Sequence, residues 1–214
     1  MRIVLFGPPG VGKGSQAGFL QDRYDATHVS TGIILRTAIR QGTPVGKAAE
    51  RMVKEGKLVE DRIVRKMAEE AIAHLGFNNF VLDGYPRTIP QAEWLTEFLK
   101  DHEAPLHCVI SLVAPEEIIV DRLSKRRVDK LTRKNYHLDF KPPPPDIPAE
   151  RIIQRADDRP EVVLRRLKQY LRDTSPVQEY YRERGLLTEI DGVGAFEEVH
   201  GRIREVLEET SALV

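Results

Sequence analysis

A glycine-rich turn that follows an apolar run constrains the fold of this chain more than any other feature. Residues 3–6 (IVLF) precede residues 7–15 (GPPGVGKGS), whose spacing fits the P-loop pattern GxxxxGK. Residues 13–24 have helical character, so the segment predicts a strand, a tight turn and a helix. In such a turn, backbone N–H groups at the helix start surround a polyphosphate and the lysine reaches its outer phosphates. The pattern predicts a nucleoside triphosphate site and leaves open what is done with the nucleotide.

Apolar runs along the rest of the chain predict the fold class. Five strand-like runs lie at residues 2–6, 27–29, 80–82, 106–113 and 186–190. Helical patterns lie between them, which predicts an α/β fold with a parallel sheet, helices on both faces, and ligands at the carboxyl ends of the strands. The last helix is expected over residues 196–209, and Pro176 is expected to kink or end the helix before it. A chain of 214 residues is long enough for one such domain with small insertions.

Composition excludes several classes of protein. Lys plus Arg and Asp plus Glu both number 33, so no excess of basic charge suggests a nucleic-acid or membrane partner. The start of the chain lacks the features of a signal peptide, and no run approaches the ~20 apolar residues of a membrane span, so a cytoplasmic protein is expected. The single cysteine, Cys108, lies in an apolar run and is expected to be a buried, inert thiol.

A helical insert is expected after the second apolar run. Ser30 or Thr31 is expected to cap a helix over residues 33–40. A second helix is expected to start at Thr43, with Pro44 at its first position, and to be broken by Gly56.

The third apolar run ends in an acidic residue. Asp83 follows this run and precedes residues 84–88 (GYPRT), a turn that contains Arg87. In a protein with a P-loop, the end of a strand is where a carboxylate belongs that holds the Mg²⁺ shell beside the phosphates. Alone, the segment would be better interpreted as an Asp-Gly turn with a surface arginine. Together with the P-loop, it predicts a second part of the phosphate site.

A helix followed by a long irregular stretch occupies the middle of the chain. Residues 116–127 are expected to form a helix with Arg122 and Arg126 on one face, where their charges repel unless an anion lies between them. Residues 128–150 show no regular pattern, which is typical of a functional lid or a disordered linker. The four prolines at residues 142–145 favour a stiff extended piece.

Taken together, these motifs resemble adenylate kinase of the long-lid type over essentially the whole chain. Residues 7–15 are similar to the family loop GxPGxGKGT, which also places a glycine, here Gly14, between the lysine and the hydroxyl. Other family signatures match Ser30, Thr31 and Gly32 with Arg36, residues 83–88 with Gln91, Asp121 and Arg122 with Arg126 and Arg127, and residues 155–158 with Arg166. The resemblance implies the P-loop nucleoside monophosphate kinase fold. It implies a core at residues 1–29, 60–122 and 159–214, an AMP-binding insert at 30–59 and a lid at 123–158.

The resemblance implies reversible transfer of the γ-phosphoryl group of MgATP to AMP, giving two ADP. Implied contacts with ATP are Gly10, Val11, Gly12, Lys13, Gly14, Ser15, Arg122, Arg126, Asn135 and Tyr136. Implied contacts with AMP are Thr31, Arg36, Lys57, Leu58, Val59, Gly84, Tyr85, Pro86, Arg87, Gln91, Arg155 and Arg166. Implied catalytic residues are Lys13, Arg87, Arg126, Arg155, Arg166 and, through the water shell of Mg²⁺, Asp83. Such a reaction needs no protein nucleophile, because it depends on positioning and charge stabilisation.

Three features depart from the family pattern. Ile33 stands where the family commonly has Asp, and residues 131–137 (LTRKNYH) replace a Gly-Arg-x-Tyr-His run. The cysteine quartet of zinc-binding lids is absent, so no structural zinc is expected. A monomer is expected. Alternatives are a kinase for UMP or CMP, the use of GTP as donor, a regulatory P-loop protein without useful turnover, and a nucleic-acid-dependent ATPase.

Overall fold

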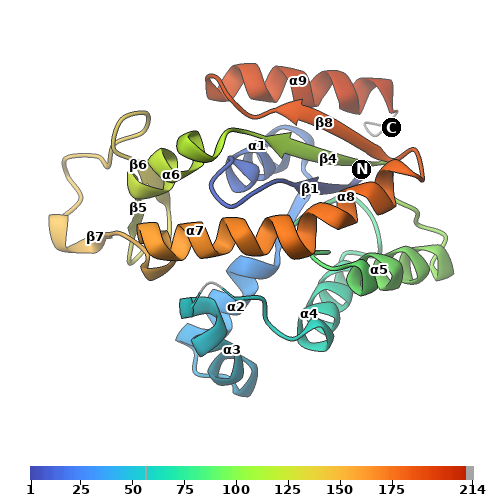
Figure 1. The fold of residues 1–214 in the computed structure, drawn as a ribbon, viewed down its shortest axis with the longest axis horizontal. Helices are drawn as coiled ribbons and strands as arrows, with labels where there is room; N and C mark the ends of the chain where they lie inside the picture. The colour runs from blue at the N-terminus through green and yellow to red at the C-terminus, as the bar shows by residue number, and fades with distance from the viewer. Residues whose placement is uncertain (56, 211–214) are drawn as a thin grey trace.

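The computed structural model describes residues 1–55 and 57–210, and a five-stranded sheet lies at its centre (Figure 1). Its strands, in spatial order, are β2 (Thr27–Ser30), β3 (Phe80–Asp83), β1 (Arg2–Phe6), β4 (Cys108–Val113) and β8 (Leu187–Asp191). Every neighbouring pair is parallel. The five predicted runs therefore correspond to the five strands, and the predicted α/β fold is confirmed.

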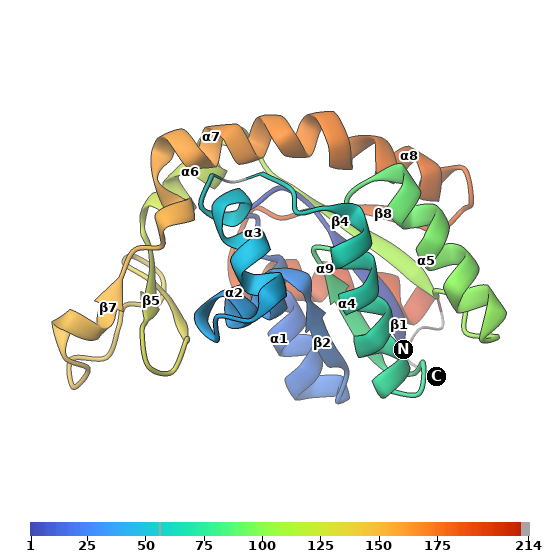
Figure 2. The same ribbon diagram turned by 90° about the horizontal axis from the view of Figure 1, so that it is seen from below.

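Helices cover both faces of this sheet, as Figures 1 and 2 show. The covering helices are α1 (Lys13–Tyr24), α4 (Asp61–His74), α5 (Ile89–Asp101), α8 (Ser175–Arg182) and α9 (Phe196–Glu209). In strand β1, Val4 and Phe6 join the core formed with α4, α5 and α8, whereas Ile3 and Leu5 join the core formed with α1 and α9. Because successive side chains of a strand point to opposite faces, burial on both sides requires an unbroken apolar run. This requirement explains why β1 was visible in the sequence.

Two further groups of elements extend from the sheet. One is the helix pair α2 (Thr31–Arg40) and α3 (Pro44–Glu55). Pro44 is the first helical residue of α3, the position predicted for it directly after Thr43. The end predicted at Gly56 lies outside the described residues. The other group is the lid segment, residues 123–158, at the left of Figure 1. Its elements are β5 (Arg126–Asp129), β6 (Asn135–His137), η1 (Ala149–Arg151), β7 (Ile152–Ile153) and η2 (Ala156–Asp158). The three strands form an antiparallel sheet in the order β6-β5-β7, which the sequence did not predict.

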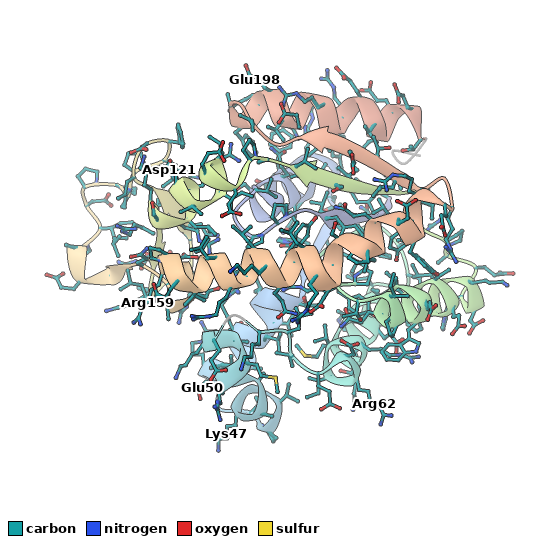
Figure 3. All side chains as sticks on the ribbon, viewed as in Figure 1. Lys47, Glu50, Arg62, Asp121, Arg159 and Glu198 are labelled. Carbon is teal, nitrogen blue, oxygen red and sulfur yellow. The ribbon has the colours of Figure 1, made fainter. Side chains whose placement is uncertain are left out.

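Two helices flank the lid segment: α6 (Glu116–Ser124) before it and α7 (Pro160–Gln169) after it. The labelled Asp121 on α6 and Arg159 at the start of α7 mark these two positions in Figure 3. The prediction that Arg122 and Arg126 share a helix face is wrong. Helix α6 ends at Ser124, and Arg126 is the first residue of β5. The sequence pattern stays helical past Ser124, but Arg126 pairs with His137 of β6 and so lies in a strand.

Helices α7 and α8 form one long interrupted rod across the front of Figure 1. Regular α-helix ends at Gln169, and a π-helical turn, η3 (Tyr170–Thr174), leads into α8. Pro176 lies in the first turn of α8. Proline has no N–H group and clashes with the carbonyl of the preceding turn, so the regular helix must be interrupted before it. The interruption predicted from Pro176 is therefore confirmed, and α9 has the predicted bounds.

The single cysteine is buried, as predicted. Cys108 is 1% exposed, and burial raises the pKa of its thiol to about 11, which makes it unreactive. Within residues 1–55 and 57–210, no helix is both long enough and apolar enough to pass through a lipid bilayer.

Candidate active site

Glycines give the P-loop its shape at the carboxyl end of β1. Gly7, Gly10 and Gly12 have φ angles of 133°, 87° and 115°, a region that strains residues with a Cβ. Gly12 caps α1, whose first residue is Lys13. The Lys13 Nζ donates hydrogen bonds to the carbonyl oxygens of Gly7 at 2.8 Å and Pro8 at 2.9 Å. The loop therefore brings a helix N-terminus and a lysine to one place, which is the arrangement that binds phosphate.

The lysine of this loop is electrostatically unusual. Burial, together with the charges of Arg87, Arg166 and Arg126, lowers the pKa of Lys13 to about 8 against the opposing effect of Asp83. Cations that are close enough to affect one another's protonation form a strong binding site for a polyanion.

Asp83 lies at the carboxyl end of β3, beside the P-loop. Its Oδ2 is 3.3 Å from both His28 Nε2 and Ser30 Oγ, which belong to the neighbouring strand β2. A Cβ placed on Gly14 would lie 3.8 Å from the same oxygen, so the carboxylate faces the first turn of α1. Burial alone would raise the pKa of Asp83, but the hydrogen bond from His28 and the charge of Lys13 lower it to about 2. Asp83 is thus a fixed negative charge next to the phosphate loop.

Ser30 occupies the N-cap position of α2, one of the two predicted positions, because the helix begins at Thr31. Its side chain, however, makes no capping hydrogen bond. The hydroxyl of Ser30 donates to Asp83, and that of Thr31 donates to the Gly84 carbonyl oxygen at 2.8 Å. Both hydroxyls therefore hold the end of β3 instead of the helix. His28 was missed as a site neighbour, although its alternation with Ser30 along one strand was a usable signal.

Four half-buried arginines, Arg36, Arg87, Arg155 and Arg166, surround the same place. Burial, together with repulsion from other arginines, lowers the pKa of Arg87 to about 10 and that of Arg155 to about 9. Burial also lowers the pKa values of Arg36 and Arg166. Arg87 and Arg155 remain cations at neutral pH, because these two values lie well above 7. Guanidinium groups that remain charged while partly shielded from solvent are suited to binding several phosphate oxygens.

Two consecutive acidic residues in η2 hold two of the site's arginines. Arg126 Nε donates to Asp158 Oδ2 at 2.8 Å, and its Nη2 donates to the other carboxylate oxygen. Arg166 Nη1 lies 3.1 Å from Asp157 Oδ2 and donates to the Asp157 carbonyl oxygen at 3.1 Å. The Asp158 side chain is fully buried. Because a guanidinium carries five N–H donors, each arginine keeps donors for a ligand after these contacts.

Arg122 joins helix α6 to the P-loop. Its Nη1 donates to the carbonyl oxygens of Val11 at 3.2 Å and Gly192 at 3.0 Å. Burial lowers the pKa of Arg122, and the charge of Asp191 opposes this effect. The guanidinium therefore lies against the backbone of the phosphate loop.

The two lid residues predicted to contact ATP, Asn135 and Tyr136, differ in how far they are exposed to solvent. Asn135 is exposed, and its Oδ1 accepts a hydrogen bond of 2.6 Å from Arg155 Nη2. The Tyr136 side chain is 5% exposed and is buried within the lid segment. Arg155 thus connects the lid to the arginine cluster, whereas the ring of Tyr136 contributes packing.

A buried ion pair holds the lid segment together. The Asp129 side chain is fully buried, and its Oδ1 accepts hydrogen bonds from Arg151 Nε at 3.1 Å and Leu131 N at 2.9 Å. Its Oδ2 accepts from Thr132 Oγ1 at 2.8 Å. Within the described part of the chain, no three His, Cys, Asp or Glu side chains are grouped to hold a metal ion. The Asp129 contacts connect β5 to Leu131 and Thr132 in the following turn and to Arg151 in η1.

A cavity lies between the α2–α3 pair and the end of the sheet. Of the residues predicted to contact AMP, it is lined by Thr31, Arg36, Lys57, Leu58, Val59, Gly84, Arg87, Gln91 and Arg166. Its lining also includes Gly32, Leu35, Val53, Val64 and Asp157, which were not predicted. Leu35 and Val53 could have been found from the helical spacing of apolar residues in the insert. Tyr85, Pro86 and Arg155 lie outside this lining; the Tyr85 hydroxyl donates to the Gln91 carbonyl oxygen at 3.3 Å.

The glycine of the Asp83–Arg87 turn allows two polar groups to meet in this cavity. Gly84 has a φ of 83°, and a Cβ there would lie 2.8 Å from Arg87 Nη2 and 2.9 Å from Thr31 Oγ1. Its carbonyl oxygen accepts from Arg87 Nε at 2.8 Å, which holds the guanidinium at the cavity wall. Any side chain at position 84 would displace these groups.

Comparison with known proteins gives a consistent match over this region. A family model described as "Adenylate kinase" matches residues 5–186, a range that includes the P-loop, the arginine cluster and the cavity. The adenylate kinase of Salinibacter ruber is 51% identical over 208 residues, covering 97% of this chain and 98% of that protein. That of Chloroherpeton thalassium is 44% identical over 213 residues, with 97% and 98% covered. That of Trichlorobacter lovleyi is 44% identical over 214 residues, with 98% and 100% covered.

Proposed function

Because the chain belongs to the adenylate kinase family, we propose that the site described above performs its phosphoryl transfer, in which MgATP and AMP are converted reversibly into two ADP. One observation carries the assignment of residues. The arginines Arg87 and Arg166, which line the cavity, also lower the pKa of Lys13 in the P-loop. A triphosphate in the loop and a monophosphate in the cavity would therefore share one set of cations.

On the donor side, the amides of the P-loop and Lys13 bind the phosphates of ATP. The residues assigned to this role are Gly10, Val11, Gly12, Lys13, Gly14 and Ser15. Arg122 lies at the edge of the loop, where its planar guanidinium can stack on the adenine ring. Asn135 and Tyr136 are assigned to the lid side of ATP.

On the acceptor side, the cavity binds AMP. Arg36 and Arg87 bind its phosphate, and Thr31, Lys57, Leu58, Val59, Gly84 and Gln91 form the rest of the pocket. Tyr85 and Pro86 shape the turn that carries Arg87, and the buried Tyr85 hydroxyl supports the Gln91 backbone.

Transfer between the two phosphates depends on charge. Phosphoryl transfer requires little covalent chemistry from the protein, so positioning and charge stabilisation provide the catalysis. Arg126, Arg155 and Arg166 surround the transferring group, and the carboxylates of η2 fix two of them in place. When bound, Mg²⁺ neutralises charge on the phosphate oxygens. Asp83, ionised and facing the first turn of α1, is placed to orient its water shell.

We further assign the segments of the chain to separate tasks. Residues 1–29, 60–122 and 159–214 form the core, residues 30–59 bind AMP, and the lid segment, 123–158, covers ATP. Lid closure that excludes water protects ATP from hydrolysis, and adenylate kinase is itself a standard example of such a lid. A monomer in the cytoplasm with nucleotides as its partners, and neither nucleic acid nor membrane, fits the balanced charge of the chain.

The assignment is tested by measuring ADP formation from MgATP with AMP, CMP, UMP or GMP offered singly, beside a control with ATP alone. Turnover is expected with AMP. Lys13→Ala and Arg87→Ala are expected to fold and to lose most activity, and Arg87→Ala should mainly weaken binding of the monophosphate. Near-normal turnover in both variants would refute the assigned roles. Offering GTP in place of ATP then establishes how strictly the donor base is selected.

A further inference from the structure

A hydrogen-bond network behind the cavity joins the first residue of α4 to the start of α5. Gln91 Nε2 donates to Asp61 Oδ1 at 2.7 Å, and Thr88 Oγ1 donates to Asp61 Oδ2 at 2.9 Å. Gln91 Oε1 accepts from the backbone N–H of Arg87 at 2.7 Å. Gln91 is 1% exposed and lines the cavity, while Asp61 is outside the lining and acts on it through Gln91.

These contacts fix the direction of the Gln91 side-chain amide. A carboxylate only accepts hydrogen bonds and a backbone N–H only donates them. Asp61 therefore requires the NH₂ group of Gln91, and Arg87 requires its oxygen. Turning the amide by 180° would place oxygen against carboxylate and NH₂ against N–H, so two part-buried hydrogen bonds would become two repulsive contacts.

A fixed amide can distinguish between purine bases. After these contacts, Gln91 keeps one N–H and one lone pair of Oε1 for a ligand. Adenine offers a matching pair, because its amino group donates beside a ring nitrogen that accepts. Hypoxanthine has a carbonyl oxygen in place of the amino group and a donating N–H in place of the ring acceptor. It would match only an amide turned the other way.

We propose that Asp61 is a positioning residue that makes the monophosphate cavity select adenine over 6-oxopurines, by holding the Gln91 amide in one direction. The inference rests on the proposed role of this cavity in binding AMP. Asp61 lies outside the sequence motifs that predict the nucleotide site. Its two side-chain hydrogen bonds go to Thr88 and Gln91. Its effect on selectivity passes through one glutamine.

A purely structural role for Asp61 must be separated from this one. Asp61 is also the acidic residue in the first turn of α4, and it binds Thr88, the N-cap residue of α5. Asp61→Ala removes all of these interactions together. Thr88→Val removes the bond to Asp61 and the α5 cap but leaves the bond between Asp61 and Gln91. Asp61→Asn removes the charge but keeps an oxygen that accepts from the Gln91 NH₂ group.

The experiment compares AMP with inosine monophosphate. Calorimetry without donor gives the two dissociation constants, and steady-state assays with MgATP give KM and kcat for each acceptor. Asp61→Ala is expected to lower the preference for AMP about tenfold, within the range of discrimination that a bidentate amide–base contact provides. The loss should appear in the KM for AMP and leave the KM for ATP unchanged. Asp61→Asn should keep the preference within about threefold of wild type. Thr88→Val should lower Tm without changing the preference.

Each result decides for or against the inference. A folded Asp61→Ala variant with the wild-type preference overturns it. An equal loss of preference in Thr88→Val also overturns it, because helix placement would then explain the effect. If Asp61→Ala does not fold, Asp61→Ser replaces it, since its hydroxyl suits a helix start but is too short to bond both partners. Wild-type protein that fails to bind AMP would refute the proposed function itself, and calorimetry detects that before any variant is made.

Discussion

Binding of ATP is expected to draw a proton onto Lys13 between pH 7 and 9. In the protein without nucleotide, burial and the surrounding arginines lower the pKa of this amine to about 8. A triphosphate in the P-loop places several negative charges next to Nζ, and opposite charges at this range favour the protonated form. The pKa of Lys13 should then return to above 10.

The size of the effect follows from the two protonation states. With a pKa of about 8, the neutral fraction of Lys13 is about one tenth at pH 7, half at pH 8 and nine tenths at pH 9. Binding of ATP should therefore take up about 0.1, 0.5 and 0.9 proton at these pH values. The phosphates of the nucleotide titrate near pH 6 and add little above pH 8.

Proton uptake is measured by isothermal titration calorimetry in pairs of buffers with different ionisation enthalpies. The matched control is Lys13→Arg, which keeps a positive charge that does not titrate in this range. The difference in uptake between wild type and control isolates the lysine from other groups. Equal uptake in the two proteins at pH 9 would show that Lys13 is already charged before ATP binds, and the argument from burial would be refuted.

Three other results are expected. Arg151→Ala leaves the Asp129 carboxylate without its cation, which should lower the local stability of the lid, measured as faster hydrogen exchange in β5. Burial and the charge of Arg2 lower the pKa of His107 below 6.5, so the unfolded chain binds more protons. Urea unfolding should therefore show stability falling from pH 7 to 5, less so in His107→Gln. Cys108, with a pKa of about 11, should not react with thiol reagents at pH 8 until the protein is unfolded.

The sequence predicted best those elements whose signal is local. Strand β1, helix α1 and helix α9 have the predicted bounds, because unbroken apolar runs, a P-loop and helical spacing each act within a few residues. The lid sheet was missed for the opposite reason. Its strands have four, three and two residues, too few for periodicity to show, and β5 pairs with β7 across a long irregular connection.

The same distinction applies to the candidate site. Motifs brought Lys13 and Asp83 to notice, and the structure places both beside the arginine cluster. Contacts between segments far apart in the chain could not be predicted from the sequence. The position of Arg126 depends on Asp158, 32 residues away, and the direction of the Gln91 amide depends on Asp61, 30 residues away. No pattern in a single sequence specifies such pairs, since each depends on how the elements pack.

The ion pair between Arg126 and Asp158 has a consequence for how such enzymes diversify. It joins the two ends of the lid segment, and just beyond it Val128 pairs with Ile153, so the chain leaves the core and returns to it at a single neck. A segment closed in this way can be replaced by a shorter, longer or differently stabilised one without altering the strand order of the central sheet. We therefore expect that the lid segment can be exchanged between related proteins at this neck. Such a chimaera would keep the reaction of the protein that supplies the core and would open and close like the protein that supplies the lid.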